Sequence, residues 1–519
     1  MKRHDLVLAS GTLASRATGL LRVLVVAWVL GFTPLADAYN LANTVPNMLY
    51  DLVLGGVAGA AFIPVFVERL RLETQRRAWK SISAVLTGST SVIVVASIVV
   101  WITAPWIIDG FMALQHHSAV SVAQRDVATT LLRWFVPQIA GYAIVSMVGA
   151  IVNIHRKFGV IGWAPVANNV VCIAVLIIFR LGSSATSIRH VSSQQLLVLG
   201  LGTSAGVLLQ ALIVIPSLRG TGASRLTPRF DWHDPAWRAV RRLGSWTIGV
   251  VLTNQISLFV VLAFAVAMGG NGPVSAYTYG WSFMQMPYAV VVATILATRT
   301  PVLAEHATDG DLRAFSEIAT DILRRALVII IPVSLFLLVL ARPLVAVMLG
   351  GGNLSRSSLA GISLSVLAVG LPGFTIFQIA IRTLQTLQRA VDVFVLYVVQ
   401  NALTVAGALL LGRHSFGGLV GSISLAYSVA ALLALSTVRY RGVSLTSNLF
   451  SPAVRYASFW AFVASVMTII TYDAFSAHRG LGLLIRFVVS AVSCVAVWGV
   501  GYLYWLERSK LERRSRGNV

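Results

Sequence analysis

Fourteen long apolar stretches run through this chain of 519 residues and dominate what it can fold into. A helix that spans a bilayer needs roughly 20 mostly apolar residues, and open sheets do not cross hydrocarbon because their edges leave backbone groups unpaired. The stretches cover residues 8–30, 36–67, 82–107, 128–153, 159–181, 195–217, 243–268, 274–303, 324–349, 358–384, 392–412, 416–437, 454–474 and 483–506. The sequence therefore predicts an all-α, polytopic membrane protein with about fourteen transmembrane helices.

The second and eighth stretches are longer than one crossing requires and contain prolines. Pro46 and Pro64 lie in the second stretch, and Pro287 and Pro301 lie in the eighth. Proline removes a hydrogen bond from the helix ladder, which neighbouring helices can compensate inside a bundle. We therefore expect two bent helices here rather than four separate crossings.

The composition supports the membrane prediction and excludes several other classes. Hydrophobic residues make up 57% of the chain and charged residues only 11%, too few to cover the surface of a soluble enzyme or to keep a chain disordered. The two cysteines, Cys172 and Cys494, both lie in apolar runs and exclude a disulfide framework or a thiolate metal site. The sequence carries no ATP-binding motif, metal-ligand cluster or Ser-His-Asp set, so it predicts no cofactor and no enzyme activity.

The charge distribution predicts the topology. The formal net charge is +22, from 40 Lys and Arg against 18 Asp and Glu. If the N-terminus is inside, 29 of these 40 basic residues fall on inner segments and 9 on the outer side or its helix ends. Positive residues favour cytoplasmic loops, so the bias predicts a multi-pass protein with fourteen spans and both termini in the cytoplasm. Because topology accounts for the charge, we expect no nucleic-acid partner.

A weak internal repeat predicts the domain organisation. Residues 36–39 resemble 274–277 at an offset of 238, residues 64–68 resemble 301–305 at an offset of 237, and Pro137 and Pro372 lie 235 apart. The repeat predicts an N-terminal six-helix half (1–217), a basic cytoplasmic loop (218–242), a C-terminal six-helix half (243–441), an extra helix pair (442–506) and a basic cytoplasmic tail (507–519). Parallel repeats of this kind are typical of transporters that move one half against the other.

Two arginines lie inside the first stretch, where an ionisable side chain costs about 2.5–3.5 kcal/mol or more unless it faces a cavity or a partner. Arg16 and Arg22 are about 9 Å apart along a helix and about 120° out of phase, so both can border one wide cavity. Guanidinium groups in a dry site suit a phosphate or diphosphate, which Arg grips with two parallel hydrogen bonds. The alternative is that each arginine extends to a lipid headgroup or pairs with a carboxylate.

The second stretch carries the other candidate residues. Asp37 is either a gate or proton-linked group at the outer mouth or the N-cap of a helix. Asp51 is predicted to be a buried carboxylate that pairs with Arg16 or Arg22 or carries a proton. Asn43 and Asn47 belong to a polar stripe at helical spacing that serves either substrate binding or helix–helix hydrogen bonding.

The opening of the chain resembles the MurJ/MviN family. The resemblance rests on Ser15-Arg16-x-x-Gly19-x-x-Arg22, on Asp37-Ala38-Tyr39-x-x-Ala42-Asn43-x-x-Pro46-Asn47 and on Ala61-Phe62-Ile63-Pro64. It extends through residues 148–153 and 230–234 to about residue 305, and is weaker beyond. This family belongs to the multidrug/oligosaccharidyl-lipid/polysaccharide exporter superfamily and is taken to flip lipid II, the undecaprenyl-diphosphate-linked peptidoglycan precursor.

The resemblance implies that Arg16 and Arg22 hold the diphosphate and that Asp37 belongs to the outer gate. The chain also departs from the family pattern, in a way similar to the actinobacterial branch. Tyr50 and Asp51 replace a pair of arginines, and Ser282 replaces a further arginine. Residues 55–58 replace a Glu-Gly-Ala-Phe stretch.

The leading hypothesis is therefore a lipid II flippase that works by alternating access, driven by an ion gradient or the membrane potential. Its partners would be the lipid-linked glycan, membrane lipids and cell-wall synthesis proteins. Three alternatives remain: a transporter of another polyprenyl-linked oligosaccharide, a drug antiporter, and a non-transporting cell-wall scaffold. An arginine-biased site disfavours a cationic drug as cargo.

Overall fold

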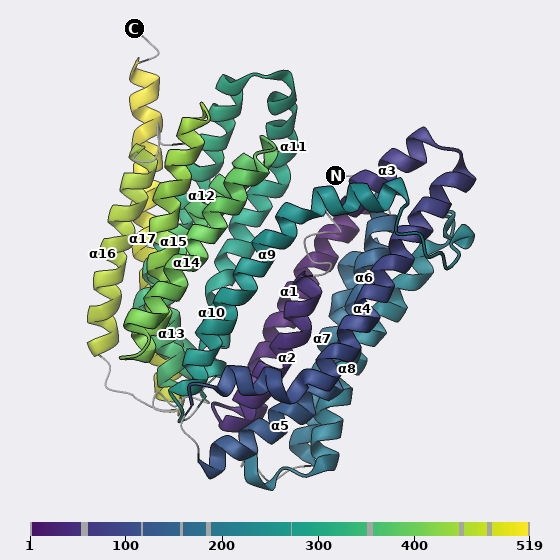
Figure 1. Cartoon of the computed structure of the whole chain (residues 1–519). Coiled ribbons are helices and arrows are strands. Elements are labelled where there is room, and N and C mark those ends of the chain that lie inside the picture. Colours follow the sequence, from purple (N-terminus) through teal and green to yellow (C-terminus); the bar gives the residue numbers. More distant parts are fainter. Residues whose placement is uncertain are drawn as a thin grey trace. The chain divides into compact units, whose positions relative to one another are not determined.

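The computed structural model describes most of the chain and contains only helices as regular elements there. It describes residues 3–52, 61–115, 118–155, 159–182, 188–270, 272–349, 357–445, 451–474 and 480–516. No strand occurs among these residues, which confirms the all-α prediction (Figure 1). Residues 55–58, which replace a motif of the resembled family, lie outside the described residues.

The chain forms two compact units, the first of which comprises Met1–Val274. Its helices are α1 (Arg3–Leu30), α2 (Pro34–Tyr50), α3 (Ile63–Leu72), α4 (Gln75–Met112), α5 (Ala119–Phe135), α6 (Pro137–Ile154), α7 (Gly159–Leu181), α8 (Ser193–Val214) and α9 (Pro235–Ala267), with short 3-10 turns η3 (Ile188–His190), η4 (Ile215–Leu218) and η5 (Ala223–Arg225).

The second unit comprises Ser275–Val519. It contains most of α10 (Pro273–Pro287), the π-helical turn η6 (Tyr288–Val292), α11 (Ala293–Asp309), α12 (Leu312–Met348), α13 (Ser358–Thr386), α14 (Ala390–Leu411), α15 (Phe416–Tyr440), α16 (Pro452–Ala474) and α17 (Gly480–Arg516). The predicted seventh span is α9, which lies in the first unit, so the compact units divide the chain slightly later than the sequence repeat does. The division into six-helix halves stays a prediction.

Thirteen segments of the described chain are long and apolar enough to cross a membrane. They correspond one to one with thirteen of the fourteen predicted spans. The remaining prediction, 36–67, begins in α2 and ends in α3, and residues 53–60 between them are outside the described part. The structure therefore agrees with a polytopic membrane protein.

Both long, proline-containing stretches are locally widened into π-helix. Residues 51 and 52 after α2 and residues 61 and 62 before α3 are π-helical, and η6 interrupts the eighth stretch directly after Pro287. A π turn often marks a bend in a long helix. The eighth stretch, from α10 to α11, is a single candidate span of 37 residues, which agrees with one bent helix rather than two crossings.

These two π-helical sites also lie at equivalent places in the sequence repeat. The first begins at Asp51 and η6 begins at Tyr288, an offset of 237 residues. The sequence anchors of the repeat have offsets of 235 to 238. A shared irregularity at the same offset supports a common origin for the two segments.

The predicted basic loop is partly helical. Helix α9 starts at Pro235, inside the loop, because Asp234 caps it: its carboxylate accepts hydrogen bonds from the Ala236 backbone (2.8 Å) and from the Ser81 hydroxyl (3.0 Å). The segment before it lies along α4, since the Thr227 backbone N–H donates to the Ser83 hydroxyl. The loop is therefore held against the first unit.

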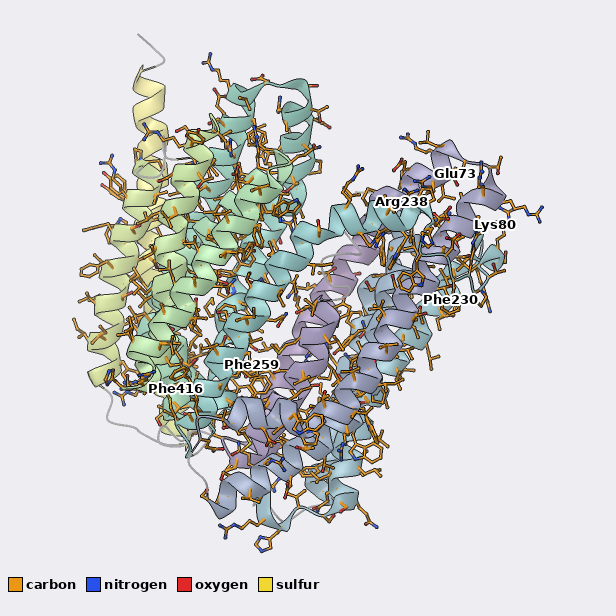
Figure 2. All side chains as sticks on the ribbon, viewed as in Figure 1. Glu73, Lys80, Phe230, Arg238, Phe259 and Phe416 are labelled. Carbon is orange, nitrogen blue, oxygen red and sulfur yellow. The ribbon has the colours of Figure 1, made fainter. Side chains whose placement is uncertain are left out.

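Basic residues and aromatic side chains gather at this end of the first unit. Figure 2 shows Lys80 of α4 and Arg238 of α9 at the same end as Phe230. In the loop, Arg229 and Asp231 form an ion pair at 2.8 Å, and this hydrogen bond holds the pKa of the Asp231 carboxyl below its usual range. Positive charge combined with exposed aromatic rings is typical of a membrane–water boundary.

Candidate functional site

Helix α1 packs along α7 through a stripe of small and polar residues. The Asn169 side-chain amide of α7 donates to the Ser15 carbonyl (3.2 Å) and to the Thr18 hydroxyl (3.0 Å). A Cβ at Gly19 would lie 3.6 Å from the same amide nitrogen. These three positions of α1 have i, i+3, i+4 spacing, and Arg22 is the i+7 position on the same face. The packing of α1 therefore directs Arg22 towards α7.

Arg22 is half-buried and lies among polar but uncharged groups. Its guanidinium is beside the thiol of Cys172, which lies one turn beyond Asn169 on α7, and Tyr39 and Tyr142 are the other titratable groups that act on it. No ion pair within the described part of the chain includes Arg22. A positive charge inside a membrane span without a carboxylate partner is expected to meet an anionic ligand.

Arg16 occupies a different face of α1. It is exposed, and it likewise forms no ion pair with any residue that the structure describes. The six-residue spacing places it about 120° from Arg22 around the helix. The two arginines therefore do not form one clamp on a single face.

A hydrogen-bonded network of neutral side chains lies around Arg22. The Tyr39 hydroxyl of α2 is 3.2 Å from the Thr203 hydroxyl of α8. In α6, Tyr142 donates to the side-chain oxygen of Gln138 (3.5 Å), and the Gln138 amide donates to the Asn43 side-chain oxygen (3.3 Å). Helices α2, α6 and α8 thus supply hydroxyls and amides to these hydrogen bonds, and the Asn43 amide is one of those groups.

Asn47 and Asp51 have hydrogen-bond partners other than those of this network. The Asn47 amide donates back to the Asn43 carbonyl at 2.9 Å, so it is bonded to its own helix. The prediction of a buried Asp51 is wrong, because the residue is exposed just beyond the end of α2 and accepts a long hydrogen bond (3.5 Å) from Gln255 of α9. Among the described residues, no ion pair joins Asp51 to either arginine of α1.

Asp37 is buried, with 3% of its surface exposed, in the first turn of α2. It is not the N-cap, because Thr33 holds that position and accepts from the Ala36 backbone at 3.2 Å. The Asp37 carboxylate instead accepts a hydrogen bond from the backbone N–H of Val274, at the start of α10 (3.4 Å). It therefore connects the first turns of two helices that are far apart in the sequence.

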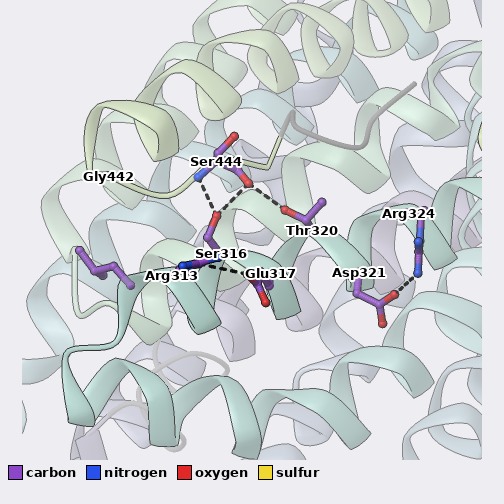
Figure 3. Close-up of a pocket in the computed structure, with 9 residues that line it drawn as sticks. Arg313, Ser316, Glu317, Thr320, Asp321, Arg324, Gly442 and Ser444 are labelled. Atoms are coloured by element: carbon purple, nitrogen blue, oxygen red, sulfur yellow. Dashed lines mark hydrogen bonds and ion pairs between the residues drawn. The ribbon is translucent and has the colours of Figure 1, made fainter. Parts of the chain in front are cut away.

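A polar pocket in the second unit offers a contrast to the Arg22 site. This pocket of about 540 Å³ lies between the start of α12 and residues 442–444 (Figure 3). Its arginines already have acidic partners on the same helix: Arg313 lies 3.5 Å from Glu317, and Arg324 pairs with Asp321. Unlike Arg22, the arginines that line this pocket therefore have carboxylate partners, and Asp321 is also shared with Arg299 and Arg325.

The chain is similar to known proteins over most of its length. A model of the family described as lipid II flippase MurJ matches residues 26–492. The chain belongs to the MurJ family. A probable lipid II flippase MurJ of Vibrio cholerae serotype O1 is 26% identical over 485 residues, which cover 90% of this chain and 87% of the relative. As a MurJ-family chain with many membrane-spanning helices, the protein is a multi-pass transporter of the bacterial inner membrane.

Solved structures show the same fold at low identity. A lipid II flippase MurJ in an inward closed conformation superposes with a TM-score of 0.75 at 18% identity and covers 96% of this chain and 100% of its own. An inward-facing multidrug resistance MATE transporter of the MOP superfamily gives a TM-score of 0.67 at 15% identity and covers 84% and 96%. The MurJ fold is thus shared with drug transporters, so the fold alone does not define the cargo.

Several residues of the network around Arg22 were missed by the sequence analysis. Thr203, Tyr142 and Cys172 lie within mostly apolar runs, and no spacing connects them to α1. Gln138 carried the clearest signal, because an amide directly after Pro137 inside a span needs a hydrogen-bond partner. At Ser282, where the family pattern has an arginine, the hydroxyl bonds to the Thr278 carbonyl of its own helix (2.8 Å).

Proposed function

We propose that this protein is a lipid II flippase, which moves the undecaprenyl-diphosphate-linked peptidoglycan precursor from the inner to the outer face of the plasma membrane. The observation that carries the proposal is Arg22: a half-buried guanidinium within a span, beside the Cys172 thiol and near the hydroxyls of Tyr39 and Tyr142. This environment suits a membrane-embedded anion, and the diphosphate is the anionic part of lipid II.

Arg22 would hold the diphosphate with two parallel, charge-assisted hydrogen bonds, a geometry in which Arg differs from Lys. Asn43 of α2 and Gln138 of α6, which are hydrogen-bonded to each other, supply neutral polar groups. Arg16 is exposed on another face of α1 and would contact the headgroup or the lipid phosphates before the diphosphate reaches Arg22. The polyprenyl tail stays in the bilayer because burying it elsewhere brings no hydrophobic gain.

The transport cycle would be alternating access driven by the membrane potential or an ion gradient. The sequence contains no nucleotide-binding motif that could couple ATP hydrolysis to the movement. The membrane potential provides about 2.3 kcal/mol per charge per 100 mV, enough to bias the movement of an anionic headgroup.

A second candidate cargo is another polyprenyl-linked oligosaccharide. The observation that favours it is the absence of the family arginines, since Tyr50, Asp51 and Ser282 occupy their positions. Such a cargo has the same diphosphate and tail but different sugars. The two candidates therefore differ only in what recognises the glycan.

Complementation tests the proposed cargo directly. Bacteria depleted of their own lipid II flippase would express this chain, and lipid II exposed on the outer face would be quantified. We expect restored exposure and growth. Good membrane expression without any restored exposure would contradict lipid II as the cargo and favour the second candidate.

Asp37 provides a prediction for the proposed outer gate. The variant Asp37→Asn keeps a side-chain oxygen for the Val274 N–H but loses the negative charge. If the charge serves the gate, we expect normal membrane expression and at least about a tenfold loss of lipid II exposure, equivalent to about 1.4 kcal/mol. Full activity of Asp37→Asn would mean that the residue is needed only as a hydrogen-bond acceptor.

Cysteine labelling tests the proposed orientation of both termini. The native Cys172 and Cys494 are buried, so they should give little background. Arg242 and Arg413 are exposed and are predicted to lie on the inner and outer side, respectively. An impermeant maleimide should label Arg413→Cys in intact cells, and Arg242→Cys only after permeabilisation. The reverse pattern would invert the topology.

A further inference from the structure

The second unit contains a group of aromatic side chains from five separate elements of the fold. We define the aromatic cluster as Trp281 of α10, Tyr288 of η6, Phe374 and Phe377 of α13, Tyr397 of α14 and Tyr427 of α15. Phe374 is at the centre, with ring centroids 4.9 Å from Tyr288, 5.0 Å from Tyr427 and 6.0 Å from Trp281. Phe377 continues the cluster, at 5.2 Å from Tyr397 and 5.7 Å from Tyr427.

The cluster has a buried base and an accessible surface. Phe374 is 4% exposed and Phe377 is fully buried, so these two rings serve as packing. Trp281, Tyr288, Tyr397 and Tyr427 are only half-buried. The rings that carry a polar atom are therefore the ones that remain accessible.

Two of the accessible rings, Tyr397 and Tyr427, lie away from the exposed sides of their helices. On α15 the exposed leucines Leu425 and Leu432 define the lipid-facing side. At 100° per residue, Tyr427 lies about 140–160° away from both of them. On α14, Tyr397 lies about 120° from the exposed Val391 and about 160° from the exposed Val395. Both tyrosines thus point to the protein side of their helices.

The polar atoms of the cluster have capacity for further hydrogen bonds. Within the described part of the chain, the hydroxyls of Tyr288 and Tyr427 bond to no residue, and neither belongs to the buried unpaired atoms. Tyr397 donates to the Gln378 side-chain oxygen at 3.3 Å, which leaves the amide N–H groups of Gln378 unused by the described residues. One turn later on α13, Arg382 is exposed.

We propose that the aromatic cluster is a sugar subsite, in which Trp281 and Tyr427 stack against a pyranose ring while Tyr288 and Gln378 bond to its hydroxyls. An aromatic face carries partial negative charge and attracts the polarised C–H groups on the face of a sugar. Ligand sites typically combine such apolar surface with a few placed polar groups. An isoprenoid chain has no hydrogen-bonding groups to use these polar atoms. The inference deepens the proposed function, on which it rests, because it assigns the glycan of the cargo to the second unit.

Binding to two related lipids tests the subsite. Purified full-length protein in nanodiscs would be titrated with lipid II and with undecaprenyl diphosphate, which lacks the sugars. We expect wild type to bind lipid II more tightly. Trp281→Leu, which keeps apolar volume but removes the aromatic face, should weaken lipid II binding about tenfold and leave the binding of undecaprenyl diphosphate unchanged. Trp281→Phe should restore most of the affinity.

Matched variants distinguish a failure of the sugar subsite from a failure of the proposed function. Phe462→Leu removes a ring that is 60% exposed on α16, outside the cluster, and should change neither affinity. Unchanged lipid II binding in both Trp281→Leu and Tyr427→Leu would overturn the sugar subsite while leaving the proposed function intact. An equal loss for both lipids would also overturn it, because the cluster would then recognise the tail or the diphosphate. Wild-type protein that binds neither lipid would refute the proposed function itself.

Discussion

Replacing Arg22 with alanine is expected to abolish transport while the protein still reaches the membrane. The Arg22 guanidinium lies between Cys172, Tyr39 and Tyr142, where its removal leaves no unpaired carboxylate behind. Two hydrogen bonds to a charged group contribute about 3 kcal/mol or more, so the loss corresponds to at least about a hundredfold. The readout is lipid II exposed on the outer face of flippase-depleted cells that express Arg22→Ala.

Two further variants make the Arg22 result specific. Arg22→Lys retains the charge but not the planar fork, and we expect intermediate activity. Arg242→Ala removes an exposed arginine at the start of α9 and should have little effect on transport. If Arg22→Ala were fully active, the diphosphate site would not be at Arg22, and a non-transporting scaffold would become the better hypothesis.

Adding a methyl group at Gly370 is expected to destabilise the second unit strongly. Helices α13 and α15 are in backbone contact there, since a Cβ at Gly370 would lie 2.7 Å from the Cα of Ser424, and one at Gly373 would lie 2.8 Å from the Cα of Ser428. Neither Cα can move without shifting its whole helix. Small residues allow this approach in membrane proteins, where van der Waals packing drives helix association. Overpacking should therefore cost about 1–3 kcal/mol in Gly370→Ala and more in Gly370→Val.

Thermal unfolding of the detergent-solubilised protein, followed by size-exclusion chromatography, measures this effect. Gly499→Ala is the matched control, because no atom lies within 4 Å of a Cβ at that position of α17. We expect Gly370→Ala to lower the apparent Tm by several degrees and Gly499→Ala to leave it unchanged. Equal Tm values for the two variants would show that α13 and α15 can separate at little cost.

Hydropathy predicted the helices well, because each span in the membrane must form the hydrogen bonds of its own backbone and is therefore a long apolar helix. Thirteen of the spans are found as helical segments in the described chain. Hydropathy placed the start of α9 too late, because residues 235–242 are polar and resemble a loop in sequence. In the structure, Asp234 caps the helix there and accepts a hydrogen bond from Ser81 of α4. Helix ends outside hydrocarbon depend on such tertiary contacts, which hydropathy does not contain.

The site was only partly predictable for a related reason. Arg22 stood out because a charge inside a span needs an explanation, whereas its neighbours Tyr142 and Cys172 are unremarkable in sequence. The same argument was applied to Asp51, which is nevertheless exposed directly after the last residue of α2. The aromatic cluster was not predicted, because its rings come from five separate elements of the sequence. Only the folded structure brings these rings into contact.

The π-helical turn η6 has a consequence for how this protein can evolve. A π turn contains one residue more than an α turn, so side chains on its two sides differ by about 100° from a continuous α-helical register. Trp281 lies before η6 and Arg299 after it, on the same crossing. A one-residue insertion or deletion at η6 would therefore turn half of this crossing against the other half. A single insertion or deletion of this kind would alter the surface that meets the cargo, with every residue before η6 left unchanged.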